Sequence, residues 1–175
     1  MKRLTLLILL AGCSVVDQPY PLAWDPVAPG EDCLRFQGSY ADRGEAPGQT
    51  ARPSLTRELF GASSPWEKAT AVRFEFVAAD TLSVTTQGSE KEPFVRLFSA
   101  KDGDFACERG RLVLRQRRWV ASDLVSGRES VKFEVHGADP YLVAHVQEFT
   151  TGVMFAVVPL SGESARWFRF PRLKP

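Results

Sequence analysis

Short runs of alternating apolar and polar residues make up most of the chain after residue 70. Alternation of this kind buries one face of a β-strand and leaves the other face in water. Turn sequences such as Asp102-Gly103 and Ser126-Gly127 separate the runs. About eight or nine strands at this spacing predict one mainly β domain. The predicted inward positions are Val72, Phe74, Phe76, Leu82, Val84, Leu112, Leu114, Val131, Phe133, Val135, Val153, Phe155, Val157, Phe168 and Phe170.

One helix is predicted ahead of most of these strands. Ser54 is a favourable N-cap residue, and Gly61 stands where a helix commonly ends. The preceding residues 41–53 are polar and rich in Gly and Pro, which predicts a loop. The helix face expected to pack inward consists of Leu55, Leu59 and Phe60. The large aromatic residues, Trp66, Trp119, Trp167 and the 12 Phe, are also predicted to lie in the core.

The short connections favour an antiparallel meander, whose open edges disappear if its first and last strands pair. We expect residues 33–40 and 166–172 to be these strands and to close an up-and-down barrel. Gly38-Ser39-Tyr40 and Arg169 resemble motifs of lipocalin-like barrels, although Tyr40 stands where lipocalins have Trp. The resemblance implies a barrel of about eight or nine strands with one short helix. A twisted open sheet covered by the helix is the alternative.

The N-terminus carries the most specific motif. Basic Met1-Lys2-Arg3 precedes the apolar run 4–11, which is far shorter than the roughly 20 residues that span a membrane. Together with Leu10-Ala11-Gly12-Cys13, this order resembles the lipobox signal peptide of bacterial lipoproteins. The resemblance implies that residues 1–12 are removed and that Cys13 is acylated, with palmitate among the attached chains.

The same resemblance implies a place in the bacterial cell envelope. Gram-negative lipoproteins retained in the inner membrane usually carry Asp after the acylated cysteine, whereas this chain has Ser14. We therefore expect an outer-membrane lipoprotein that faces the periplasm. Residues 13–31 are predicted to be a lipidated, Pro-rich tether, with Tyr20 and Trp24 either at the membrane interface or folded back on the domain. Residues 32–175 are predicted to be the single β domain.

Two cysteines remain once Cys13 is set aside. Cys33 and Cys107 form an even pair in a chain predicted to be exported, which favours a disulfide over two buried thiols.

Four further patterns resemble small, mostly uncharacterised β-rich lipoproteins of proteobacteria. The resemblance covers most of residues 33–170 and implies no known activity. The patterns are Cys33-Leu34-x-Phe36-x-Gly38-x-Tyr40, Leu55-x-x-x-Leu59-Phe60, Cys107-x-x-Gly110-x-Leu112 and Trp167-x-Arg169-Phe170.

Residues that could carry chemistry are few. His136 and His145 flank a predicted turn, and a metal site of about three protein ligands would need a carboxylate such as Glu134 or Glu148. We expect both histidines to be packing or surface residues instead. The sequence contains no Gly-x-Ser-x-Gly, His-Glu-x-x-His or phosphate-loop motif. We therefore predict no catalytic residues, no metal and no cofactor.

Charge argues against nucleic acid as a partner. The chain has 22 Lys+Arg and 21 Asp+Glu, a net charge of +1, whereas nucleic-acid binders are usually strongly basic. Arg111, Arg115 and Arg117 share one strand face. This basic stripe is our candidate contact for an anionic partner, such as an envelope protein, a cell-wall polymer or lipid headgroups. The alternative is a solvated face paired with acidic neighbours such as Glu134.

Two function classes therefore remain ahead of an enzyme. The first is a lipid-anchored, non-enzymatic interaction or structural module of the envelope. The second is a carrier that holds a small apolar ligand inside a barrel. The many inward Phe residues favour a filled interior and hence the first class. A filled interior with exposed apolar side chains would support it further, whereas an empty apolar cavity would favour the carrier.

Overall fold

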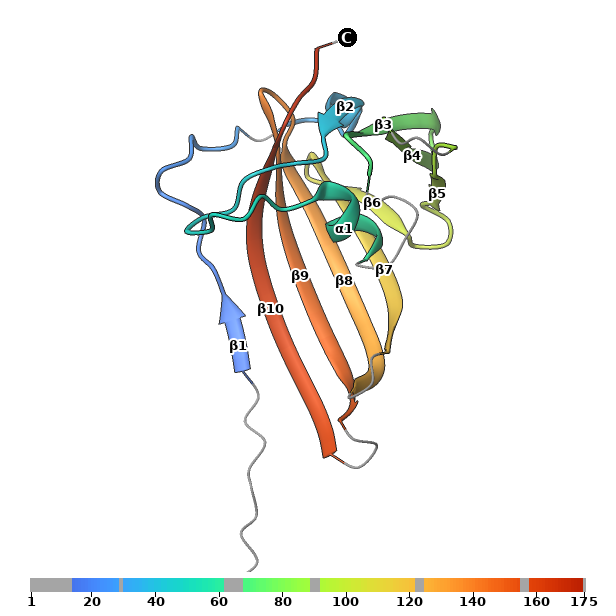
Figure 1. The fold of residues 1–175 in the computed structure, drawn as a ribbon. Helices are drawn as coiled ribbons and strands as arrows, with labels where there is room; N and C mark the ends of the chain where they lie inside the picture. The colour runs from blue at the N-terminus through green and yellow to red at the C-terminus, as the bar shows by residue number, and fades with distance from the viewer. Residues whose placement is uncertain are drawn as a thin grey trace, which may run out of the picture.

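The structure, a computed structural model, describes residues 14–28, 30–61, 68–88, 92–121, 125–154 and 158–174. Two β-sheets and one short helix make up these residues (Figure 1). The four-stranded sheet runs β2-β3-β4-β5, and the six-stranded sheet runs β1-β10-β9-β8-β7-β6. The lipobox, Trp66 and Phe155 lie outside the described residues.

The predicted antiparallel meander is confirmed within each sheet. The smaller sheet consists of β2 (Gly38–Ala41), β3 (Ala71–Ala78), β4 (Thr81–Gln87) and β5 (Val95–Ser99). In the larger sheet, the meander consists of β6 (Phe105–Glu108), β7 (Arg111–Ala121), β8 (Val125–Gly137), β9 (Tyr141–Met154) and β10 (Val158–Pro171). Strand β1 (Ser14–Asp17) adds to its edge and pairs in parallel with β10.

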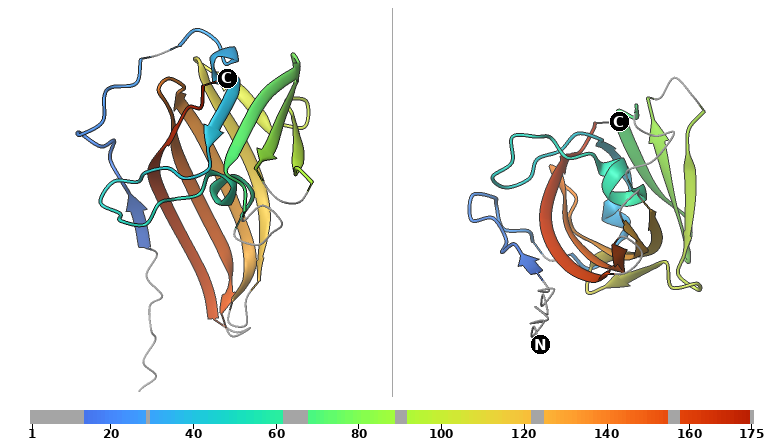
Figure 2. Two further views of the ribbon diagram at one scale, coloured as in Figure 1. Left: turned by 45° about the horizontal axis from the view of Figure 1, so that its top comes forward. Right: turned by 60° about the horizontal axis from the view of Figure 1, so that its bottom comes forward.

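Helix α1 (Leu55–Phe60) forms as predicted. The Ser54 hydroxyl accepts a hydrogen bond from the backbone N–H of Arg57, and Gly61 ends the helix with a φ of 94°. Asp42, itself buried, accepts hydrogen bonds from the hydroxyl of Ser54 (3.0 Å) and from the backbone N–H of Thr56 (2.8 Å). Figure 2 shows the helix inside the curve of the long strands. Its buried apolar residues are Leu55, Leu59 and Phe60.

Among the described residues, the strand ladders form two separate sheets, and no closed barrel is detected. Residues 33–40 are predicted to be one strand, but the structure has a 3₁₀ turn at Leu34–Phe36 and the short strand β2, which pairs with β3. In the part of the chain that the structure describes, β2 meets the residue that follows β10 at a single bridge, Tyr40 to Arg172. At the other junction, the Asp104 N–H donates to the Ser99 carbonyl (3.0 Å), with no ladder between β5 and β6. A four-residue edge strand is too short to pair with all of β10.

One apolar core nevertheless joins both sheets and the helix. Tyr40 is fully buried, and its hydroxyl donates a hydrogen bond to the carbonyl of Phe36 (3.0 Å). Burial raises the pKa of Tyr40 to about 12, because a buried phenolate would lose its hydration. Packed side chains fill the apolar part of the interior. The fully buried aromatic residues are Phe36, Tyr40, Phe74, Phe98, Phe133, Phe168 and Phe170.

Some residues predicted to be inward are on the surface. Trp119 is 65% exposed, Phe149 is 49% exposed and Val153 is 40% exposed. They occupy the outward positions of β7 and β9, because side chains alternate between the two faces along a strand. Phe76 is only partly buried against the core. Aromatic content alone was therefore a poor guide to burial at these positions.

Residues 14–28, which belong to the predicted tether, lie along the domain. The indole N–H of Trp167 donates to the carbonyl of Gln18 (3.0 Å), and the ring of Tyr20 meets the Trp167 ring edge-on, with centroids 4.9 Å apart. The guanidinium of Arg169 lies 5.0 Å from the centre of the Trp24 ring. Of the two alternatives given for Trp24, the structure shows the ring folded back on the domain.

Candidate functional site

The three arginines of the basic stripe lie on β7, on the outer face of the six-stranded sheet. Arg111 contacts Glu134 (3.7 Å), and Arg115 forms an ion pair with Glu108 (2.5 Å). Arg117 is exposed, and among the described residues no ion pair involves it. Arg111 and Arg115 are thus partly neutralised, and Arg117 is the member of the stripe best placed to meet an anion.

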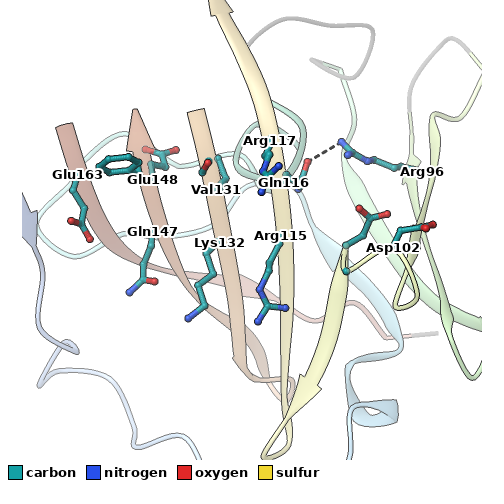
Figure 3. Close-up of a pocket in the computed structure, with 14 residues that line it drawn as sticks. Arg96, Asp102, Arg115, Gln116, Arg117, Val131, Lys132, Gln147, Glu148 and Glu163 are labelled. Carbon is teal, nitrogen blue, oxygen red and sulfur yellow. Dashed lines mark hydrogen bonds between the residues drawn. The ribbon is translucent and has the colours of Figure 1, made fainter. Parts of the chain in front are cut away.

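Arg115 and Arg117 border an open groove of about 700 Å³ beside β5 (Figure 3). At one side of the groove, Arg96 donates a hydrogen bond to the side-chain oxygen of Gln116 (2.8 Å), which the dashed line marks. Cations and carboxylates are equal in number around the groove, so its charge is mixed. The charged lining residues are Arg96, Arg115, Arg117, Lys132, Asp102, Asp104, Glu148 and Glu163.

A second hollow, of about 750 Å³, lies against α1 on the inner side of the long strands. Arg118 contacts Glu129 (3.0 Å), and Arg166 contacts Glu148 (2.6 Å) and, from further away, Glu58 of α1 (3.8 Å). Burial raises the pKa of Glu58, because its charged form is poorly hydrated there. The charged lining consists of Arg43, Arg52, Arg57, Arg118, Arg166, Glu58, Glu129 and Glu148.

This second hollow was not found from the sequence, although a signal existed. On β7, Arg118 has the same parity as the buried residue Leu114, and on β10 Arg166 has the same parity as Phe168. Charged residues at inward positions mark the place where an apolar core gives way to a polar interior. Because arginines outnumber carboxylates here, the hollow can hold an anionic group through charge-assisted hydrogen bonds.

Both histidines pack against one tryptophan, Trp167. The rings of His145 and Trp167 are stacked with centroids 4.4 Å apart, and the ring of His136 lies 5.0 Å from the same indole. Burial lowers the pKa of His145. The His136 imidazole, together with the ammonium of Lys132, lowers the pKa of Glu134 to about 2. Glu134 therefore stays anionic even in mildly acidic solution.

Cys33 and Cys107 are joined by a disulfide, as predicted, with their Cα atoms 6.0 Å apart. Cys33 is buried just before the 3₁₀ turn, whereas Cys107 is exposed on β6. The bridge thus ties the chain segment that leads into β2 to the edge of the six-stranded sheet. It reinforces a junction that has little backbone pairing.

Membrane and metal features were also sought within the described ranges. None of the helices there has the length and apolar character needed to cross a bilayer. In the same residues, no three or more His, Cys, Asp or Glu side chains gather in a way that could hold a metal ion.

Comparison with known proteins does not place the chain in a family. No protein-family model, no curated protein and no solved structure matches it.

Proposed function

We propose that this protein is a lipid-anchored lipoprotein of the bacterial cell envelope. Acylated Cys13 holds it in the outer membrane, and its β domain faces the periplasm. The domain acts without enzymatic activity, by contact with an envelope protein or a cell-wall polymer. The order of basic start, apolar run and Leu10-Ala11-Gly12-Cys13 supports the anchor.

The filled interior is the observation that supports an interaction module. Side chains of both sheets and of α1 form one packed cluster, and large aromatic residues such as Phe133 are fully buried within it. A domain filled in this way meets its partners through its surface. The lipocalin-like barrel remains part of the proposal, supported by this shared core and by the bridge between Tyr40 and Arg172.

We propose the basic stripe as the contact, with Arg117 at its centre. Arg117→Glu, combined with Arg111→Gln and Arg115→Gln, should lower the recovery of cross-linked envelope partners roughly tenfold, as expected for a loss of about 1.4 kcal/mol. Salt should have the same effect, because the Debye length falls to about 3 Å at 1 M. Quantitative mass spectrometry of cross-linked, membrane-extracted protein measures the recovery.

Charge reversal at an unrelated place is the matched control. Arg73→Glu changes an exposed arginine on β3, in the other sheet, and should leave partner recovery unchanged. Thermal stability should stay nearly constant in all variants, because exposed ion pairs contribute little to stability. If the stripe variant keeps every partner, the stripe is only a solvated face.

A carrier is the second candidate, and the charged hollow against α1 favours it. Its arginine-rich lining suits a polar anion better than the apolar ligand expected of a lipocalin-like interior. Native mass spectrometry of the same purified protein separates the candidates. A stoichiometric small molecule would support the carrier, whereas a bare domain would support the interaction module.

A further inference from the structure

The half of the six-stranded sheet that contains Met154 and Val158 carries exposed apolar side chains. The chain turns there from β7 to β8 and from β9 to β10, at the bottom of Figure 1. Trp119, Phe149, Val153 and Val158 are 65%, 49%, 40% and 39% exposed, respectively. These four residues are called the distal apolar end below.

The strand register places three of these residues near one another on one face of the sheet. Trp119 pairs with Arg128, and Arg128 pairs with Thr151 on β9. Phe149 and Val153 flank Thr151 and share its face, because successive side chains of a strand alternate. Three of the four residues therefore lie together on the outer face of the sheet.

The fourth residue shows that the end is apolar on both faces. Val158 pairs with Met154 at the start of β10, one position along from Val153 and hence on the opposite face. A protein partner that docks on one face would leave the other face uncovered. A surrounding apolar medium covers both faces.

The direction of β1 places the predicted lipid anchor toward the same end. Ser14, the first residue of β1, pairs in parallel with Gly162 of β10. Cys13 directly precedes Ser14 in the sequence. Val158 lies four residues before Gly162 along β10, a distance of about 13 Å at 3.3 Å per residue. By register, Val153 and Val158 therefore extend beyond the start of β1 on the side from which Cys13 joins it, and Trp119 lies about one residue past Ser14. Phe149 pairs with Glu163 and is level with Val15, so it lies just inside β1.

The distance along β10 between Gly162 and Val158 can be compared with the dimensions of a bilayer. One headgroup layer is roughly 5–8 Å thick, so Val158, about 13 Å past Ser14, reaches the acyl boundary when the lipid on Cys13 is inserted. Trp119, about 3 Å past Ser14 by register, then lies within the boundary layer between water and membrane. Tryptophan is enriched at this boundary, and arginine favours anionic headgroups. Trp119 and its neighbour Arg128 are both exposed and supply these two side-chain types.

We infer that the distal apolar end inserts into the interfacial layer of the phospholipid bilayer and holds the domain upright on the membrane. The inference rests on the proposed lipid anchor at Cys13. It adds a second contact, made by protein side chains, so that β1 and the strand ends together fix the orientation of the basic stripe. The occupant of this surface is the bilayer itself.

Fluorescence quenching by brominated lipids tests the inference. The acylated mature protein, extracted from membranes, is reconstituted into phosphatidylcholine–phosphatidylglycerol vesicles whose acyl chains carry bromine. Wild-type tryptophan emission should be quenched, and Trp119→Phe should remove the quenchable component. Trp24→Phe is the matched control and should keep it, because Trp24 packs against Arg169, far along β10 from the distal apolar end.

Flotation of the same vesicles separates the two proposals. Protein that floats with the vesicles, but whose Trp119 emission is not quenched, would overturn the inference and leave the anchor intact. Equal quenching of wild type and Trp119→Phe would overturn it as well. Protein that carries no lipid and does not float would contradict the proposed function, and the inference would fall with it.

Discussion

Phe133→Ala should lower the free energy of unfolding by about 3–5 kcal/mol. Phe133 is fully buried at the centre of β8 and lies in register between Leu114 of β7 and Val146 of β9, which are also fully buried. Truncation removes apolar contacts and leaves a cavity that rigid strands on both sides cannot fill. Urea unfolding followed by circular dichroism measures the loss.

A second phenylalanine on the neighbouring strand provides the control. Phe149 of β9 is half exposed on the outer face, so Phe149→Ala should cost less than about 1 kcal/mol. Equal losses at the two positions would contradict the assignment of inner and outer faces.

Cys107→Ser should destabilise the domain by about 4 kcal/mol on the loop-entropy account of disulfides. The bridge closes a separation of 74 residues, and its removal lets the unfolded chain explore many more conformations. Cys107 is exposed, so serine is tolerated in the folded state and the loss arises mainly in the unfolded one. The melting temperature should fall on the order of 10 °C.

Reductant supplies the matching control for the disulfide. Wild-type protein treated with dithiothreitol should melt near the temperature of Cys107→Ser, and the variant should not respond to the reagent. If oxidised and reduced wild type melt together, the bridge contributes nothing to stability.

Local patterns account for the parts of the fold that the sequence predicted. Alternation placed Val131, Phe133 and Val135 on the inner face of β8, because the two-residue period of a strand is visible without tertiary information. The N-cap Ser54 and the terminating Gly61 bounded α1 for the same reason. An even pair of cysteines in a chain predicted to be exported was enough to predict the bridge.

Long-range geometry accounts for the parts that could not be predicted. Alternation does not identify a strand's partner, so the pairing of β2 with β3 and the missing closure with β10 depend on contacts across the whole chain. The two-residue period of a strand also does not show how far along the strand the apolar core extends. From the sequence, Arg118 and Arg166 therefore look like ordinary surface charges. Only the arrangement of the strands around α1 shows that both line the inner hollow.

The aromatic residues show the same limit. Trp119 and Phe149 were assigned to the core by residue type, against the parity of their own strands. Their outward positions follow from the strand register, which is known only once the sheet is assembled. This exposed surface is the one that we propose as a contact with the membrane.

Mass spectrometry of the N-terminal peptide tests the lipid anchor most directly. Protein extracted from native membranes should begin at Cys13, carry acyl chains on that residue and lack residues 1–12. In Cys13→Ala, cleavage and acylation at this position should both be absent. Membrane-extracted wild-type protein with an unmodified Cys13 would contradict the account.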